Sequence, residues 1–266
     1  MNSLLKADFF SLLKSKITYV VLFICLGFPI LMVLIYVGIG KFILNLSDDL
    51  EEMIEFRDMF SVKAITFSAF SLTQNIGLII PIFVGIITMA DIRNGTIRNK
   101  VIIGKKRTEI YLSHLIVATC FCVVMIFVSF LMFFGASSIF FNYGPKVDAK
   151  QVESFFRCLC IGILTFVFVA SLSTFLALAT KSMPLTIIVT LVTVIVLSLF
   201  CTLSPLLPTD KYNYIFYAIP TYANTLLISY DPLPLDVFLF GVGSYLVFSA
   251  LNTVLGIVIF NKTDLK

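Results

Sequence analysis

The stretch Ile17–Gly40 reads ITYVVLFICLGFPILMVLIYVGIG and carries no charged residue over 24 positions. A hydrocarbon core about 30 Å thick requires about 20 helical residues to cross it. The stretch is therefore long enough and apolar enough to span a membrane as a helix. It is also longer than the roughly 7–15-residue apolar region of a signal peptide, and no small-residue cleavage site follows it, so we expect a retained first span.

Five further runs have the same character, each without Asp, Glu or Lys. Together the predicted spans are Ile17–Gly40, Ile65–Ala90, Tyr111–Phe134, Phe155–Thr180, Leu185–Leu203 and Val237–Phe260. None shows the alternating pattern, about ten residues long, of an outer-membrane barrel strand. We therefore predict an all-α polytopic protein with six transmembrane helices, forming a single transmembrane domain over residues 1–266.

The composition of the whole chain agrees with a lipid environment. Hydrophobic residues make up 59% of the sequence and charged residues 13%, with a mean hydropathy of +1.06. Soluble domains carry about 25% charged residues, and disordered chains combine low hydrophobicity with high charge. Both classes are excluded, and we expect the lipid bilayer, rather than nucleic acid, to be a partner.

Basic residues predict the orientation of the spans. Twelve of the 19 Lys and Arg residues fall on the side that holds both termini, and an acidic cluster, Asp48–Glu52, falls on the other. Because cytoplasmic loops are enriched in Lys and Arg, we expect a multi-pass protein of the cell membrane with both termini in the cytoplasm.

Two segments outside the spans are predicted to contact the membrane. Residues Asn2–Lys16 form an amphipathic helix that lies at the bilayer surface or extends the first span into the cytosol. Its apolar face is predicted to hold Leu5, Phe9, Leu12 and Leu13, with Asp8, Ser11, Lys14 and Ser15 mainly opposite. Residues Ser204–Asp236 contain five of the nine prolines around the short apolar run Tyr214–Pro220. Since this run is too short to span, we predict an outer re-entrant hairpin before the sixth span.

Several kinds of chemistry are missing from the sequence. The one histidine, His114, excludes a two-histidine metal site, and no P-loop motif for binding ATP is present. The six cysteines all fall within predicted spans, where they serve as small packing residues. No carboxylate lies inside a predicted span, which argues against a proton-coupled or voltage-sensing mechanism. We expect no enzyme activity, metal or cofactor in this chain.

The basic loop after the second span is the most informative segment. It runs from Asp91 to Arg107 with the sequence DIRNGTIRNKVIIGKKR. Residues Thr96–Ile103 are predicted to form about two helical turns, with Ile97, Val101 and either Ile102 or Ile103 on one side. Gly104 is placed to end this helix in the left-handed conformation. The loop is either a docking element or an anchor for anionic lipid, and its charges alone do not decide between these functions.

Here the sequence resembles a known family. The pattern Gly95-Thr96-Ile97-Arg98-Asn99-Lys100, then Gly104, Arg107 and Tyr111-Leu112-Ser113, resembles the first cytoplasmic loop of ABC type-2 exporter permeases. The similarity is greatest to small bacterial permeases associated with resistance to bacitracin, lantibiotics or other antimicrobial peptides. Those permeases also have an interfacial helix, six spans and an outer hairpin. They commonly carry Glu near the end of the second span, where this chain has Asp91.

The resemblance implies a permease subunit that exports an amphipathic substrate: a peptide, an antibiotic or a lipid-like molecule. It implies a second permease subunit, in a homodimer or heterodimer, and a separate ABC ATPase subunit that binds ATP and Mg²⁺. The loop would include the coupling helix that contacts the ATPase. The residues assigned to coupling are Asp91, Arg93, Gly95, Thr96, Arg98, Asn99, Lys100, Gly104, Lys105, Lys106 and Arg107.

Two other functions compete with an ATP-driven exporter. A six-span secondary transporter or channel would need no ATPase, but it would not explain the glycine-bracketed loop. A membrane-embedded enzyme or scaffold has no evident active site in this sequence. An adjacent gene for a P-loop ATPase would favour the exporter.

Polar residues within the spans are candidates for a substrate pathway. Ser71, Gln74 and Asn75 lie in the second predicted span, and Asn252 lies in the sixth. An unpaired amide in hydrocarbon is costly, so these side chains face protein or water. They either line the translocation path at the dimer centre or form hydrogen bonds between helices of one subunit.

Overall fold

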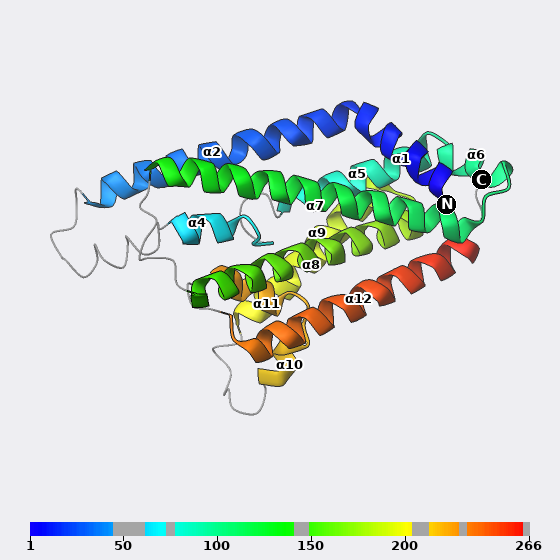
Figure 1. Ribbon diagram of the computed structural model, residues 1–266. Helices are drawn as coiled ribbons and strands as arrows, with labels where there is room; N and C mark the ends of the chain where they lie inside the picture. Colours follow the sequence, from blue (N-terminus) through cyan, green and yellow to red (C-terminus); the bar gives the residue numbers. More distant parts are fainter. Residues whose placement is uncertain (45–61, 73–77, 141–148, 204–212, 229–232, 263–266) are drawn as a thin grey trace.

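The computed structural model is helical throughout the part of the chain that it describes (Figure 1). The described residues are 1–44, 62–72, 78–140, 149–203, 213–228 and 233–262. Five helices are long and apolar enough to cross a membrane: α2 (Lys16–Leu44), α7 (Arg107–Phe140), α8 (Ala149–Thr180), α9 (Met183–Thr202) and α12 (Leu235–Lys262). They confirm five of the predicted spans, with most of the helices extending a few residues beyond the apolar runs.

The core of the bundle is built around α8. About 61% of the apolar segment of α8 is buried within the protein, whereas the buried share is 22% for the apolar segments of α2 and α12. The helix packs against α7, α12, α9 and α5 (Ile79–Arg93). Ile161, Phe166 and Val169 on α8 are fully buried. The outer faces of α2 and α12 instead expose large apolar side chains, as expected for helices surrounded by lipid.

The second predicted span, Ile65–Ala90, is not one continuous helix, so that prediction is wrong. Helix α4 (Val62–Ser68) ends near the start of the predicted span. Residues 69–72 are not helical, and α5 begins at Ile79. A distant segment supplies partners to the backbone at this point. The Asn224 side chain, on α11 (Tyr222–Thr225), hydrogen-bonds the backbone of Phe70 and Leu72 in place of the missing helical bonds. We call residues 69–72 the break.

The two ends of the bundle are different. Both termini lie at one end together with α1 (Asn2–Lys14) and α6 (Thr96–Ile102), which we call the terminal end (Figure 1). Toward the opposite end lie α4 and the short helices α10 (Asn213–Tyr217) and α11, which is continued by η3 (Leu226–Ile228). These short helices precede α12, where the hairpin was predicted, and Ala223 and Leu227 bury their side chains in the core.

Helix α1 is present as predicted, but its faces are assigned differently. Leu4, Asp8 and Leu12 are buried, whereas Phe10 and Leu13 are exposed. Asp8 was predicted mainly opposite the apolar face of this helix. It lies instead on the buried face, since partners on α6 and α7 compensate its charge.

Candidate functional site

Helix α6 is a short helix held between two glycines. Gly95 has φ of 69° and Gly104 has φ of 87°, both in the left-handed region that other residues rarely adopt. A Cβ atom would meet no other atom within 4 Å at either position, so backbone conformation, not space, requires glycine there. The predicted left-handed end at Gly104 is confirmed. Gly95 adopts the same left-handed conformation in the turn between α5 and α6.

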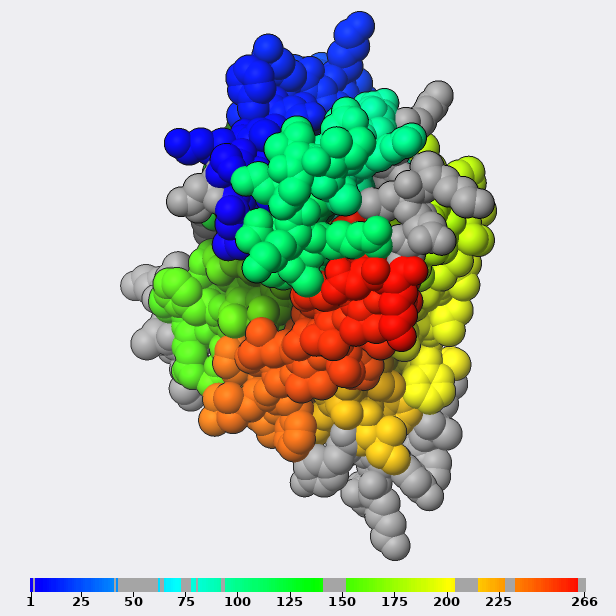
Figure 2. Space-filling view, turned by 90° about the vertical axis from the view of Figure 1, so that its right-hand side faces the viewer, coloured from blue at the N-terminus to red at the C-terminus, as the bar shows by residue number. Residues whose placement is uncertain are grey.

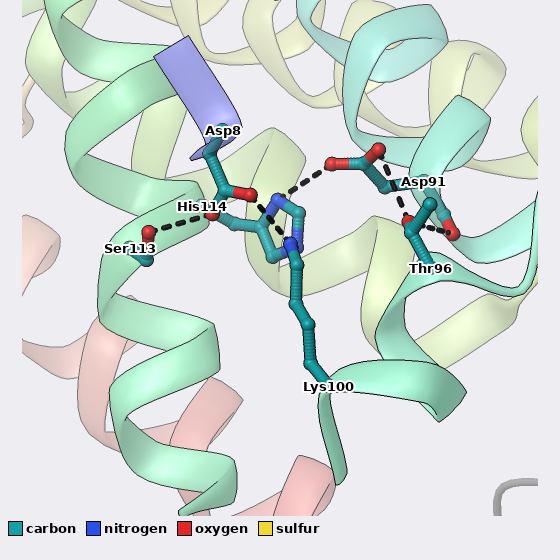
Figure 3. A network of polar contacts seen from close by, with 6 residues as sticks. All are labelled: Asp8, Asp91, Thr96, Lys100, Ser113 and His114. Atoms are coloured by element: carbon teal, nitrogen blue, oxygen red, sulfur yellow. Dashed lines mark hydrogen bonds and ion pairs between the residues drawn. The ribbon is translucent and has the colours of Figure 1, made fainter. Parts of the chain in front are cut away.

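The inner side of α6 carries an ion pair to the N-terminal helix. Lys100 Nζ lies 2.5 Å from Asp8 Oδ1, with Asp8 5% and Lys100 14% exposed (Figure 3). The Ser113 hydroxyl on α7 donates a 2.6 Å hydrogen bond to the other carboxylate oxygen, Asp8 Oδ2. Both oxygens of this buried carboxylate are therefore paired, as a charge removed from water requires.

A second pair of contacts ties α5 and α7 to the same cluster. His114 Nδ1 lies 3.3 Å from Asp91 Oδ2, and its Nε2 lies 3.4 Å from Lys100 Nζ. The imidazole tautomer with its proton on Nδ1 satisfies both contacts, donating to Asp91 and accepting from Lys100. The Thr96 hydroxyl lies 2.8 Å from the Asp91 carbonyl and 3.2 Å from Asp91 Oδ1. Asp91 therefore contacts both α6 and α7.

We call these residues the terminal cluster: Asp8, Asp91, Thr96, Lys100, Ser113 and His114. They come from α1, α5, α6 and α7, and their contacts fix α6 at its base. Around them, Leu4, Ile97 and Tyr111 pack with Phe260 of α12 in a small apolar core. Asp8, Ser113 and His114 were not among the predicted coupling residues. The sequence signals for them were indirect: Asp8 is the one acidic residue of a basic N-terminal helix, Ser113 lies in the family motif, and His114 is the one histidine.

The outer side of α6 is apolar at its tip. Ile102 is 72% and Ile103 76% exposed, although one of them was predicted to lie on the same side of the helix as Ile97 and Val101. That prediction is wrong for this pair, because Ile97 and Val101 suffice to cover the apolar core beneath α6. Arg98, Asn99, Gly104 and Lys106 are also exposed, and Lys105 is half-buried. Figure 2 shows this end of the molecule, where α6 and the start of α7 stand beside the last turn of α12.

Arg107 contacts its own chain. Its guanidinium donates to the carbonyl oxygens of Phe260 at 3.2 Å and Asn261 at 2.9 Å. These are among the last carbonyls of α12, which lack helical partners and carry the negative end of the helix dipole. Arg107 therefore fastens the start of α7 to the end of α12. Arg93 is the last residue of α5, and its side chain lies outside the described part.

The predicted pathway residues are found at different depths. Gln74 and Asn75 lie outside the described residues. Ser71 is fully buried in the break, and within the described residues its hydroxyl has no hydrogen-bond partner. Asn252 donates to Ser171 Oγ of α8 at 3.3 Å, and its carbonyl oxygen lies 3.4 Å from the Tyr111 hydroxyl near the terminal end. The observed amide contact of Asn252 is therefore one between helices of the same subunit.

The described part of the chain contains no arrangement of side chains that is typical of a metal centre. Within those residues, no group of three or more His, Cys, Asp or Glu side chains is arranged to hold a metal ion. The six cysteines are free thiols, and Cys25, Cys122, Cys158 and Cys201 are buried among apolar side chains.

Comparison with known proteins agrees with this geometry. A family model described as ABC-2 family transporter protein matches residues 4–197, about three quarters of the chain. The match includes α1, the break, α6 and the terminal cluster. No curated protein matches the chain significantly.

Proposed function

The chain belongs to the ABC-2 transporter family, and from this premise we propose that it is the permease subunit of an ATP-driven exporter. It is a multi-pass membrane protein, and permease components of this family lack ATPase domains of their own. In the proposed transporter, a separate ABC ATPase subunit binds ATP and Mg²⁺. A second permease subunit completes the pathway. The family does not specify a substrate, and an amphipathic peptide, antibiotic or lipid-like molecule fits the apolar spans.

We place the terminal end in the cytoplasm. The side of the chain with both termini holds 12 of the 19 Lys and Arg residues, and α1 and α6 lie at that same end. On this orientation, α1 lies at the inner membrane surface with Phe10 and Leu13 toward lipid and Lys6 and Lys14 exposed to headgroups. Helices α4 and α5 together complete a sixth, interrupted span. The short helices α10 and α11 enter the outer leaflet as a re-entrant hairpin.

We propose that α6 is the coupling helix, and one observation carries this proposal. Polar contacts to three other helices fix its base, and one of them is the Lys100–Asp8 ion pair. Its tip projects Ile102 and Ile103 outward. Two adjacent exposed isoleucines form an apolar patch at the tip of α6, and we propose that a protein partner covers this patch. A push on such a helix moves the bundle as rigid bodies, which is how ATP binding in a partner can switch the pathway.

The predicted coupling residues then divide into two groups. Arg98, Asn99, Lys105 and Lys106 surround the isoleucine tip and are available to an acidic rim of the ATPase. Asp91, Thr96, Lys100 and Arg107 bind within the permease and transmit the push. Gly95 and Gly104 set the shape of the helix. Arg93 belongs to the coupling loop by its position in the sequence, and Ser71, Gln74, Asn75 and Asn252 stay the proposed pathway residues.

The substitution Ile103→Asp tests this assignment. Placing a charge in the apolar contact should reduce co-purifying Mg²⁺-dependent ATPase activity about tenfold or more. The tagged permease is purified from its native membranes, and ATP hydrolysis is measured per mole of permease. Ile139→Asp is the matched control, because Ile139 is 77% exposed but lies at the other end of α7. Equal ATPase activity with both variants would overturn the proposal that α6 docks the ATPase.

A further inference from the structure

The break in the second span leaves backbone groups that need partners. Ala69, Phe70 and Ser71 still donate their N–H groups to carbonyls three residues earlier, at 3.0–3.2 Å. Leu72 does not continue this series, since its N–H donates to Asn224 Oδ1 at 2.8 Å. The Asn224 amide nitrogen in turn donates to the Phe70 carbonyl oxygen at 2.9 Å. One side chain thus pairs with a donor and an acceptor of the same turn, as a neighbouring strand would.

The amide is itself held in a buried network. Asn224 is 2% exposed, and its amide nitrogen also lies 3.2 Å from Thr165 Oγ1 on α8. Thr165 Oγ1 lies 2.8 Å from the hydroxyl of Tyr245 on α12, and both residues are fully buried. The network therefore connects the break, α8, α11 and α12. Unpaired backbone groups inside a membrane cost several kcal/mol each, so a break at this depth depends on such side-chain partners.

The aromatic ring beside the break adds a steric contact. Phe70 is 1% exposed and stacks on Phe130 of α7, with ring centroids 5.0 Å apart. Its other neighbour is Gly162 of α8, where an added Cβ would lie 2.5 Å from Phe70 Cδ1. The described residues of the break are thus packed between α7 and α8 as well as hydrogen-bonded to α11. This turn is a fixed part of the outer half of the bundle.

The inner half of the span has different attachments. Helix α5 packs against α8 and α9 and leads through Gly95 into α6, to which the Asp91–Thr96 contact joins it. Helix α4 packs against η3 and against α7, which α5 also contacts. Apart from α7, the two halves of the second span have different neighbours, because α5 is connected to α6 and α4 to the short outer helices.

We propose that Asn224 is a positioning residue that clamps Phe70–Leu72 to α8, α11 and α12. The clamp keeps α4 with the outer half of the bundle when α6 and α5 move. The clamp follows from contacts within the chain, whereas the movement rests on the proposed ATP-driven function. Neither the Asn224 contacts nor the separation of α4 from α5 depends on which substrate is transported.

Amide hydrogen exchange at Leu72 tests the clamp directly. The permease–ATPase complex is purified from native membranes and measured with and without ATP and vanadate. The Leu72 amide of the wild type should stay protected under both conditions, whereas the exchange rates of the α6 amides should change. Asn224→Leu removes the acceptor, so exchange at Leu72 should rise about tenfold and become sensitive to ATP. Asn252→Leu is the control, because that amide binds Ser171 and not the break, and it should leave Leu72 protected.

Asn224→Asp adds a readout that a general loss of folding would not produce. The introduced carboxyl group still accepts from the Leu72 N–H, but once ionised it cannot donate to the Phe70 carbonyl and leaves an unpaired charge in the buried network. Relative to wild type at the same pH, exchange at Leu72 in this variant should therefore increase as the pH is raised and the carboxyl group ionises. This comparison also serves if Asn224→Leu fails to fold.

The outcomes separate the clamp from the proposed function. Unchanged exchange at Leu72 in both Asn224 variants would overturn the clamp. Wild-type exchange at Leu72 that changes with ATP as much as α6 would also overturn it, because α4 would then move with α6. Suppose that Leu72 loses protection in the variants but the exchange of the α6 amides does not change with ATP. This result would support the clamp and count against ATP-driven coupling.

Discussion

Asp8 holds two helices at once, because one carboxylate oxygen binds Lys100 of α6 and the other binds Ser113 of α7. Removing one partner of a buried ion pair leaves the other charge uncompensated, and this usually costs more than the pair itself contributes. Partial exposure of Lys100 and the nearby Asp91 carboxylate moderate the cost at this site.

We predict that Asp8→Ala destabilises the permease by about 2–3 kcal/mol, since Lys100 and His114 then face each other without the carboxylate. Lys100→Met should cost a similar amount through the unpaired Asp8. The double variant should be more stable than either single variant, because it leaves neither charge unpaired. Thermal unfolding followed by circular dichroism in detergent measures all four proteins. Additive losses would show that the two residues do not interact.

At the scale of helices, α7 and α12 approach closely at one glycine. A Cβ at Gly256 would lie 2.1 Å from the Tyr111 hydroxyl oxygen and 2.4 Å from Tyr111 Cζ. The Tyr111 ring is fully buried in the apolar core beneath α6 and has no free space to enter. The close packing of Tyr111 against Gly256 therefore positions the terminal end of α12, together with the hydrogen bonds of Arg107.

We predict that Gly256→Ala destabilises the helix pair by about 1–3 kcal/mol through overpacking. Gly243→Ala on the same helix is the control, because no atom lies within 4 Å of its added Cβ. The melting temperature of the variants in detergent is the measurement. A second change, Tyr111→Leu, should restore part of the stability of Gly256→Ala. Equal melting temperatures for the two alanine variants would contradict the close approach.

The helices also show how far the sequence could predict this structure. Spans and the glycine ends of α6 were predictable, since apolar length and left-handed φ angles depend on local residues. The break was not, because its stabilising partner, Asn224, lies 152 residues from Leu72, and polar residues in a span do not by themselves indicate where a helix ends. The burial of Asp8 was missed for the same reason, since Lys100 lies 92 residues away. Long-range pairing of polar groups leaves no periodic signal in one sequence.

The whole molecule separates its tasks by end. The terminal end holds the buried Lys100–Asp8 ion pair and the exposed tip of α6, and the opposite end holds α4 and the short helices around Asn224. Orientation in the membrane gives each end its role, because only a cytoplasmic terminal end can meet an ATPase. Position-specific labelling of the two ends can therefore test the proposed arrangement.

We predict that Asn99→Cys reacts only with thiol reagents that reach the cytoplasm, because Asn99 is exposed on α6. Val152→Cys, at the start of α8 and 44% exposed, should react with a membrane-impermeant maleimide added to intact cells. Both changes are made after the six native cysteines are replaced by alanine. Labelling of Asn99→Cys from outside intact cells would reverse the orientation and remove α6 from reach of the ATPase.

The distance along the chain between Leu72 and Asn224 has a consequence for biosynthesis. A ribosome adds about 5–20 residues per second, so the 152 residues between them take about 8–30 s to synthesise. The second span therefore leaves the ribosome before the side chain that holds its break exists. During that interval the nascent chain must satisfy the backbone of Phe70 and Leu72 by other means, and the native turn is completed only when the outer short helices arrive.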